Sequence, residues 1–400
     1  MSAYGPAWGS GPADVLPAQP PFTPPRAERH LAGTPSTARV VNDRATLTTL
    51  FTRARTIAEI RALTGVSKPT AYQSVARLHA LALAEPVPDS ARPGAHSPGP
   101  PPQQFRIPPG TAPFAAVSLA GGRLQVRLAD AAGRLLGESD GATAPAASPV
   151  TADDVCAALA AACASSGLLP AQLDVVVVAA PLHLAEALGA SAHGALADRA
   201  GTDVQVVIDA DSAATAAHDL DPAARTDTYL FVWADAEILL SGRLQGRPVS
   251  GCSGSSLARR TARFFDGVDT AALDELRRTA ACPARNAGSL PGGTPGAPPP
   301  GGARTLAAQL ALALAGPAAL LDPRTVLLAG PRFGSLAPVL APLVQEELEQ
   351  LIPAPPTVCA AGVPGDAVMA GALRQALTHV RGRLVGSIDE GAAQRMPRYA

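Results

Sequence analysis

The chain has 400 residues, of which 47% are hydrophobic, and its 32 Lys and Arg nearly balance its 33 Asp and Glu. That length exceeds one ordinary core and predicts two or three domains. A net charge of -1 excludes a protein that coats nucleic acid or membrane over its whole surface. The five cysteines show no CxxC spacing, so we expect reduced thiols, no disulfide framework and no metal site.

The N-terminus has no basic segment followed by an apolar core, which argues against a signal peptide. The longest apolar run, 306–321, is shorter than the roughly 20 residues that a bilayer requires, and Gln309 and Gly316-Pro317 interrupt it. We therefore expect a cytoplasmic protein without a membrane segment.

Residues 1–40 are rich in Pro, Gly, Ala and Ser and show no apolar period, which predicts a disordered tail. Asn42 or Asp43 can cap a first helix. Leu47, Leu50 and Phe51 then follow the i, i+3, i+4 spacing of one apolar helix face. The sequence thus predicts a first domain helix that begins near residue 42.

The segment 56–81, TIAEIRALTGVSKPTAYQSVARLHAL, predicts two short helices joined by a tight turn. Thr56 and Glu59 fit a capping box at the start of the first helix. Gly65 can adopt the left-handed backbone that ends it, and Ser67 can cap the second helix. This arrangement is typical of a helix-turn-helix that places its second helix in the major groove of DNA.

In that second helix Ala71, Val75 and Leu78 should face inward. Any small helical hairpin shares these features, but charge favours DNA: residues 41–85 hold six Arg or Lys against three acids. We predict a DNA-binding domain over 41–86, in which Lys68 and Arg77 contact phosphate or base edges while Thr70 and Gln73 help to read sequence. The predicted DNA-binding residues are Ser67, Lys68, Thr70, Tyr72, Gln73, Ser74 and Arg77. Strand formers are scarce after them, so residues 87–110 are interpreted as a wing remnant or linker.

From residue 114 the sequence alternates between apolar and polar positions, which predicts a three-strand meander over 114–139. A helix (153–165), a strand (173–180), a helix (184–200), a strand (204–209) and a helix from Ser212 follow. The same order repeats: a meander over 228–247, helices between 256 and 281, a helix (306–320), a strand (325–330), a helix (336–351), a strand (357–362) and a helix (366–379). We predict two α/β lobes, 111–220 and 221–380, with a flexible loop over 283–303 and a tail over 381–400. This pseudo-duplication is typical of the actin-like, ribonuclease-H-like sugar kinase architecture, whose ligand lies between the lobes.

Several segments resemble the ROK family (repressors, open reading frames, kinases), on the side of its xylose-repressor-like transcriptional regulators. The resemblance spans about 45–377 and is carried by LTGVSKPTAYQSVARL, VRLADAAGRLL, VVIDADSAATAA, ALALAGPAALLDPRTVLLAGP and GDAVMAGALRQAL. It implies a winged helix-turn-helix followed by a duplicated actin-like ATPase or sugar kinase fold. It also implies a homodimer or homotetramer, a double-stranded DNA operator and a possible sugar effector.

The same resemblance marks where kinase chemistry would lie. The family's Asp-X-Gly-Gly-Thr phosphate loop matches 118–122, which lacks the aspartate and the threonine, and its Asn-Asp pair matches Ile208-Asp209, which keeps only the carboxylate. Its Glu-X-Gly-His element falls on 252–255 without either charged residue, and only Cys282 remains of a zinc knuckle. Phosphoryl transfer depends on positioned phosphates and a held sugar, so these losses predict a protein that is not an enzyme and needs no cofactor.

Three residues are candidates for binding a ligand in the body: Asp209, Asp211 and His183. Asp209 and Asp211 could instead cap the following helix together with Ser212, and His183 could be structural. Asp235 and Glu237 lie where the family has a second glycine-rich turn, and their charge would repel a phosphate. Two alternatives to an effector-sensing regulator stay open: an ATP-dependent sugar kinase, and a regulator whose body only dimerises.

Overall fold

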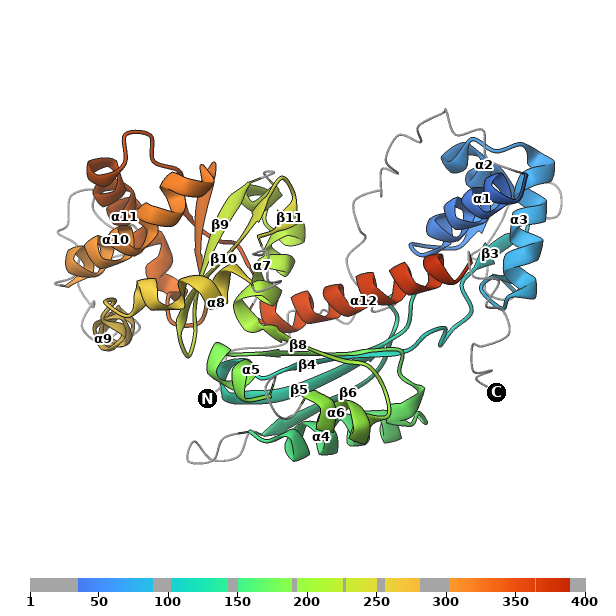
Figure 1. The fold of residues 1–400 in the computed structure, drawn as a ribbon, viewed down its shortest axis with the longest axis horizontal. Coiled ribbons are helices and arrows are strands. Elements are labelled where there is room, and N and C mark those ends of the chain that lie inside the picture. The colour runs from blue at the N-terminus through green and yellow to red at the C-terminus, as the bar shows by residue number, and fades with distance from the viewer. Residues whose placement is uncertain are drawn as a thin grey trace, which may run out of the picture.

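The computed structural model describes residues 35–88, 102–142, 150–188, 193–225, 228–249, 256–280, 302–363 and 365–388. Most of the expected tail, residues 1–34, and most of the expected flexible loop, 283–301, lie outside these residues. The described chain forms a small helical domain and two α/β lobes, which α12 joins (Figure 1).

The N-terminal domain packs three helices around the apolar side chains that the sequence indicated, including Leu47, Ile60 and Leu78. The helices are α1 (Pro35–Leu50), α2 (Ile57–Thr64) and α3 (Lys68–Ala80). The expected start of the first helix at Asn42 or Asp43 is wrong, because α1 begins at Pro35 and both residues lie inside it. Residues 35–40, predicted as the end of the tail, therefore belong to α1.

The turn between α2 and α3 has the predicted local chemistry. Thr56 and Glu59 form a reciprocal capping box, with N–H···O distances of 2.8 and 3.2 Å. Gly65 adopts the left-handed conformation with φ of 71°, and the Ser67 hydroxyl accepts a hydrogen bond from the Thr70 amide. These contacts satisfy amide groups that helix ends leave without an intrahelical partner. The helix-turn-helix is confirmed as a local structure.

A small wing accompanies these helices. The strands β1 (Arg55–Thr56), β3 (Gln104–Arg106) and β2 (Glu85–Pro86) form an antiparallel sheet in that order. An ion pair of 2.7 Å between Arg106 and Glu85 joins two of them. Of the stretch 87–110, interpreted as a wing remnant or linker, the described residues supply the three-residue central strand of this sheet, and residues 89–101 lie outside the described residues.

The first lobe is built on a five-stranded mixed sheet in the order β6-β5-β4-β7-β8. The meander is confirmed as antiparallel β4, β5 and β6, while β7 and β8 run parallel to β4. The expected helix over 184–200 is two helices, and the helix expected from Ser212 begins at Asp209. The bounds are β4 Phe114–Ser118, β5 Arg123–Ala129, β6 Leu135–Ala142, α4 Ala152–Ser165, β7 Val176–Ala180, α5 Leu182–Ala187, α6 His193–Ala200, β8 Val204–Ile208 and α7 Asp209–Leu220.

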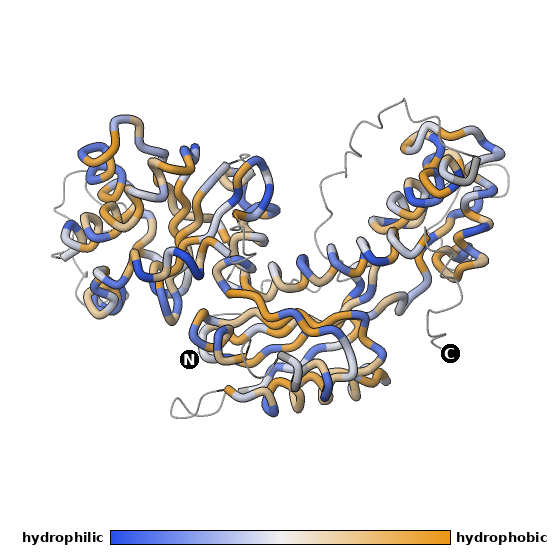
Figure 2. The backbone as a smooth tube through the Cα atoms, in the orientation of Figure 1, coloured by the Kyte–Doolittle hydropathy of each residue, from blue (hydrophilic) through white to orange (hydrophobic). Residues whose placement is uncertain are grey.

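The second lobe repeats this plan with a sheet in the order β11-β10-β9-β12-β13, so the pseudo-duplication is confirmed. Hydrophobic residues concentrate on the strands of both sheets and on the inner sides of the covering helices (Figure 2). The bounds are β9 Tyr229–Ala234, β10 Ile238–Leu244, β11 Arg247–Pro248, α8 Leu257–Thr261, η6 Ala262–Phe265, α9 Thr270–Ala280, α10 Ala303–Leu321, β12 Thr325–Ala329, α11 Ala337–Leu351 and β13 Thr357–Ala360.

Helix α10 is, by length and composition, the one helix of the described residues that could cross a membrane, with a mean hydropathy of 1.4. Its apolar inner side, including Leu306, Leu310 and Leu314, is buried in the core of the second lobe beside α11. This apolar side of α10 is therefore part of the core of the second lobe.

Helix α12 (Ala367–Ser387) returns to the first lobe, where it packs against α7, β4 and β7 (Figure 1). The prediction had placed it in the second lobe and had ended it at 379, with a tail over 381–400. Gly371 permits the close approach of α12 and α7, because an added Cβ would lie 1.7 Å from the Ser212 carbonyl oxygen. The far end of α12 reaches the N-terminal domain, where Arg44 donates a hydrogen bond of 3.2 Å to the Val385 carbonyl.

Candidate functional site

Helix α3 presents an exposed polar face that leads outward from the turn. Ser67, Lys68, Tyr72 and Gln73 are exposed, with Tyr72 at 52%, and Thr70 is half-buried against the Ser67 hydroxyl. In Figure 1, α3 lies at the side of the N-terminal domain that faces away from the two lobes. These five predicted DNA-binding residues therefore share one accessible surface around the first turns of α3, which we call the α3 face.

The remaining two predicted DNA-binding residues serve the interior of the domain. Ser74 is fully buried, so its predicted outward position is wrong. The Arg77 guanidinium donates hydrogen bonds of 2.7 and 2.6 Å to Asp43 on α1 and another of 3.2 Å to the Ser74 hydroxyl. The hydrogen bonds to Asp43 raise the pKa of Arg77. Ser74 and Arg77 thus join α3 to α1. The sequence had instead predicted that both residues contact DNA.

Most other cations near the α3 face are also paired within the domain. Arg53 and Arg55 lie against Glu59, and Arg106 lies against Glu85. Within the described part of the chain, Lys68 and the exposed Arg61 take part in no ion pair. Sequence reasoning missed Arg61, although its place in the last turn of α2, near the turn, was visible in the sequence.

A second candidate site lies where the two lobes meet, around Asp209. This residue is in the first turn of α7 and only 2% exposed, and its carboxylate accepts a hydrogen bond of 2.6 Å from the Ala210 amide. Burial raises the pKa of Asp209 to about 7, although the hydrogen bond from the Ala210 amide lowers it. The negative charges of Asp235 and Glu237 also raise this pKa. Asp209 is therefore a group that exchanges a proton near neutral pH.

Two hydrogen bonds cross between the lobes beside Asp209. The Gly121 amide, in the glycine turn η2 (Ala120–Gly122) that follows β4, donates to Asp235 over 2.9 Å. His183 Nδ1 lies 3.1 Å from Glu237 Oε1. Asp235 thus accepts the hydrogen bond of an amide in the turn that the family resemblance aligns with the kinase phosphate loop. Its negative charge opposes the binding of a phosphate there.

The three predicted ligand residues separate into a pair and a single residue. Asp209 and His183 both lie beside Glu237, whereas Asp211 accepts a hydrogen bond of 2.7 Å from Ser241 on β10 and has a pKa raised by burial. Neither aspartate is the cap of α7, because Ile208 holds that position without a side-chain bond. The buried Trp233 indole N–H lies beside the Asp209 carboxylate, whose pKa it lowers against the effect of burial, and it is a polar group that the prediction did not include.

The described residues contain no group of three His, Cys, Asp or Glu side chains that could hold a metal ion. The segment 252–255 and Cys282, which the family resemblance aligns with the sugar-binding and zinc elements, lie outside the described residues.

Two mixed five-stranded sheets, repeated in tandem and joined by α12, define an α/β fold of the actin-like class, here preceded by a helix-turn-helix domain with a small sheet. No family model matches the sequence, and no curated protein matches it either. Solved structures match the fold at low sequence identity, and all three described next are ROK proteins.

One of them is a ROK family transcriptional regulator, described as a homologue of the E. coli MLC protein. It has a TM-score of 0.55 and 15% identity, and the match covers 88% of this chain and 100% of the regulator. A ROK hexokinase from Thermus thermophilus has a TM-score of 0.47 at 17% identity, covering 68% and 99% of the two chains. A ROK glucokinase from Streptomyces griseus, in complex with glucose and AMPPNP, has a TM-score of 0.45 at 19% identity, covering 66% and 98%. The match to the regulator shows that this chain has the fold of a ROK protein.

Proposed function

We propose that this protein is a DNA-binding transcriptional regulator of the ROK type that acts as a repressor, with a body that responds to a small effector such as a sugar. The observation that carries the proposal is the α3 face, a capped helix start with exposed polar side chains on a helix-turn-helix. The match to a ROK regulator also supports it. That match covers 88% of this chain, which is more than the two lobes over residues 102–388 contain, so it extends into the residues that precede them.

On this proposal α3 enters the major groove by its N-terminal turns. Lys68 and the amides at the start of α3 contact phosphate, which fixes the register of the domain on the duplex. Gln73 reads a base edge, since a glutamine amide can pair with N6 and N7 of adenine, and Thr70 and Tyr72 complete the contact with neighbouring bases.

The proposal includes a homodimer or homotetramer, because a single domain of this size reads only a short half-site. Two α3 helices related by a two-fold axis would then bind half-sites spaced by about one helical turn, roughly 34 Å, or a multiple of it. An effector that binds preferentially to one arrangement of the lobes would shift the population of the DNA-binding state.

We also propose that the body catalyses no phosphoryl transfer. The contact of Asp235 with the Gly121 amide supports this view, since it places a carboxylate where a nucleotide would need a free amide. A coupled assay with ATP, magnesium and a panel of hexoses tests it, and turnover that Asp209→Asn abolishes would establish the kinase alternative.

A body that only dimerises is distinguished from one that binds an effector by thermal unfolding against sugars and sugar phosphates. A ligand at a hundred times its dissociation constant adds about 2.7 kcal/mol to the free energy of unfolding. The effector proposal expects such a shift for at least one compound and its loss in His183→Ala. Unchanged unfolding with every compound would favour the dimerising body.

DNA binding itself is tested by a gel-shift titration of the full chain against the DNA upstream of its own coding region. Gln73→Ala should weaken specific binding about fivefold or more, since a bidentate base contact contributes about 1–3 kcal/mol. Gln350→Ala, an equivalent change at an exposed position of α11, is the matched control. Equal affinity of the wild type and the Gln73→Ala variant would contradict the proposed role of the α3 face.

A further inference from the structure

The second lobe carries an apolar groove on its surface, between η6 and α10. Its volume is about 360 Å³. Two of its walls are large hydrophobic side chains open to solvent, Phe264 at 51% and Leu312 at 71% exposed. The residues that line it are Phe264, Gly267, Gln309, Leu312, Ala313, Gly316 and Pro317.

The apolar surface continues along α10 beyond the groove. Leu320 is 85% exposed, and between Arg304 and Asp322 no residue of the helix carries a charge. Single exposed hydrophobic residues are ordinary on protein surfaces, but a groove with a continuous apolar flank indicates a surface that contacts something.

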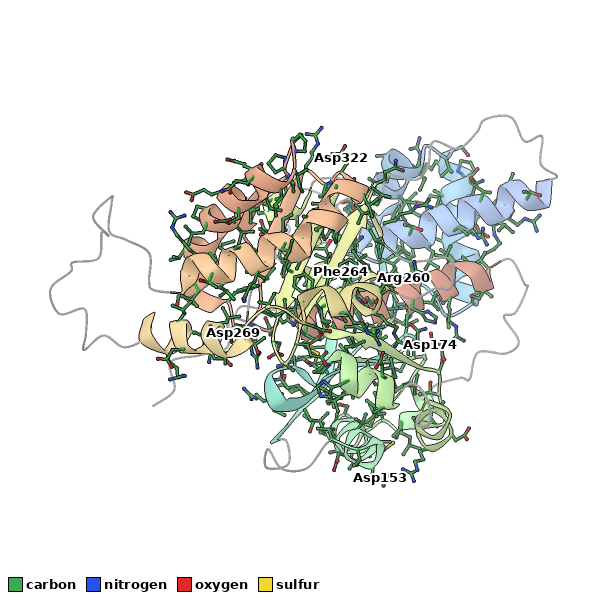
Figure 3. The ribbon with its side chains drawn as sticks, turned by 60° about the vertical axis from the view of Figure 1, so that its left-hand side comes forward. Asp153, Asp174, Arg260, Phe264, Asp269 and Asp322 are labelled. Carbon is green, nitrogen blue, oxygen red and sulfur yellow. The ribbon has the colours of Figure 1, made fainter. Side chains whose placement is uncertain are left out.

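Arginines border one side of this groove. Arg259 and Arg260 on α8 and Arg263 on η6 are exposed, and no described residue forms an ion pair with any of them. Arg260 precedes Phe264 by four residues, across the break at Thr261 between α8 and η6, and Figure 3 shows the two residues next to each other. The exposed Asp266 and Asp269 follow Phe264 along the chain. The groove therefore has cations on its α8 side.

We propose that this groove docks an acidic, amphipathic segment of a protein partner. An aromatic or aliphatic side chain of the partner inserts between Phe264 and Leu312, and carboxylates beside it pair with Arg259, Arg260 and Arg263. Charge complementarity selects this occupant: the arginines on the rim have no anionic partner among the described residues, and carboxylates would supply it.

Other occupants fit these observations less well. A second copy of the chain that set its arginine side against the same side of the first copy would bring like charges together, and these repel. Leu312 and Leu320 are exposed and would also contact a membrane surface, whereas the hollow between Phe264 and Leu312 suits the insertion of one side chain.

The docking surface goes beyond the proposed DNA-binding function, because it lies on the second lobe and α3 lies at the opposite end of the molecule (Figure 1). A partner in the groove and DNA on α3 can therefore be bound at the same time. In that arrangement the regulator would hold another protein at the operator.

The test is a selection of random 12-residue peptides displayed on phage against the immobilised full chain. We expect enriched peptides with an aromatic or aliphatic residue flanked by at least two acidic residues. A synthetic peptide of that sequence should bind at least about tenfold more weakly to Leu312→Glu and to Arg259→Glu/Arg260→Glu, since few residues dominate such contacts. The affinity of the same samples for DNA reports whether these variants are folded. It does not depend on whether they bind the peptide.

Matched controls place equal charge changes on other exposed positions. Leu169→Glu substitutes a leucine that is 66% exposed on the first lobe, and Arg123→Glu/Arg247→Glu changes the charge by the same amount as the arginine pair. Both controls should bind the peptide as the wild type does. Equal loss in the controls, or no enriched peptide at all, would overturn the proposal.

Three further results would overturn it in favour of another occupant. If Leu312→Glu reduces the sedimentation mass of the wild-type oligomer, the groove is a contact between copies of this chain. If the wild type but not Leu312→Glu floats with vesicles containing phosphatidylglycerol, it is a membrane contact. If peptides bind only after deletion of residues 283–300, that segment of the chain itself fills the groove.

Discussion

Arg77 on α3 and Asp43 on α1 are joined by two hydrogen bonds of 2.7 and 2.6 Å, 34 residues apart in the sequence. The Asp43 side chain is only 8% exposed, whereas that of Arg77 is 33% exposed. The pair fixes the angle between the helix that would read DNA and the helix behind it. The pair therefore contributes to the position of α3, while the contacts with DNA that we propose lie on the α3 face.

Arg77→Ala should destabilise the N-terminal domain, because the nearly buried Asp43 carboxylate loses its cation. We expect a loss of about 1–3 kcal/mol, reduced from the value for a fully buried pair because solvent reaches Arg77. Amide hydrogen exchange in α1 and α3 of the full chain measures it. The double variant Asp43→Asn/Arg77→Gln should recover part of the protection, and a single variant as protected as the wild type would contradict the structural role.

Lys68 should set part of the salt dependence of DNA binding. Replacing it with alanine removes one phosphate contact per domain, which should reduce the slope of log Kobs against log salt by about 1 for each bound domain. Lys68→Arg retains the cation and should retain the slope. If Lys68→Ala leaves the slope unchanged while the domain stays folded, Lys68 contacts no phosphate.

The local chemistry of the N-terminal domain follows from short-range sequence patterns. The Thr56 and Glu59 capping box and the left-handed Gly65 depend on residues within a few positions, and the structure agrees with each. Ser74 was open to the same reasoning: it follows Ala71 by three residues and precedes Leu78 by four, so it belongs to the buried arc of α3. The Arg77–Asp43 pair could not be found this way, because the two residues meet only through the packing of α1 on α3.

In the body, the strands were predictable where the apolar runs are long, as in β7 and β12, which lie inside the sheets and are fully buried. The wing strand β3 has three residues in a proline-rich context, and backbone pairing to two distant strands stabilises it. Helix α12 carried a recognisable apolar pattern, but nothing local in it indicates which lobe it covers. The contact of Asp235 with Gly121 likewise arises from tertiary structure alone.

Asp209 should make stability depend on pH. Its pKa is raised to about 7 in the folded protein from 3.8, so between these values the folded state holds a proton that the unfolded state has released. Stability should therefore fall as pH rises from about 4 to 7 and then level off, by at most on the order of 4 kcal/mol. Asp209→Asn should lose this dependence, so its stability relative to the wild type should be higher at pH 8 than at pH 5. A constant difference across pH would contradict the assignment.

Arg381 links the body to the N-terminal domain. It is on α12, donates hydrogen bonds of 2.9 Å to the Ala131 carbonyl and 3.0 Å to the Phe51 carbonyl, and lies 4.9 Å from the centre of the Phe51 ring. Arg381→Met should leave both carbonyls without this donor, at about 1–3 kcal/mol each, and loosen the domain from the body. Small-angle scattering of the full chain should then show a broader distribution of distances. Arg383→Met, at a side chain that is 54% exposed, is the control, and equal profiles for both variants would contradict the link.

The most direct test of the account is the selection of binding sequences from random double-stranded DNA by the full chain, repeated with Gln73→Ala. The account predicts that the wild type enriches an inverted repeat whose half-sites are about one helical turn apart or a multiple of it, and that Gln73→Ala loses the preference at one base pair in each half-site. No enriched sequence with the wild type, or the same sequence enriched equally by Gln73→Ala, would contradict the assignment of α3 as the helix that reads DNA.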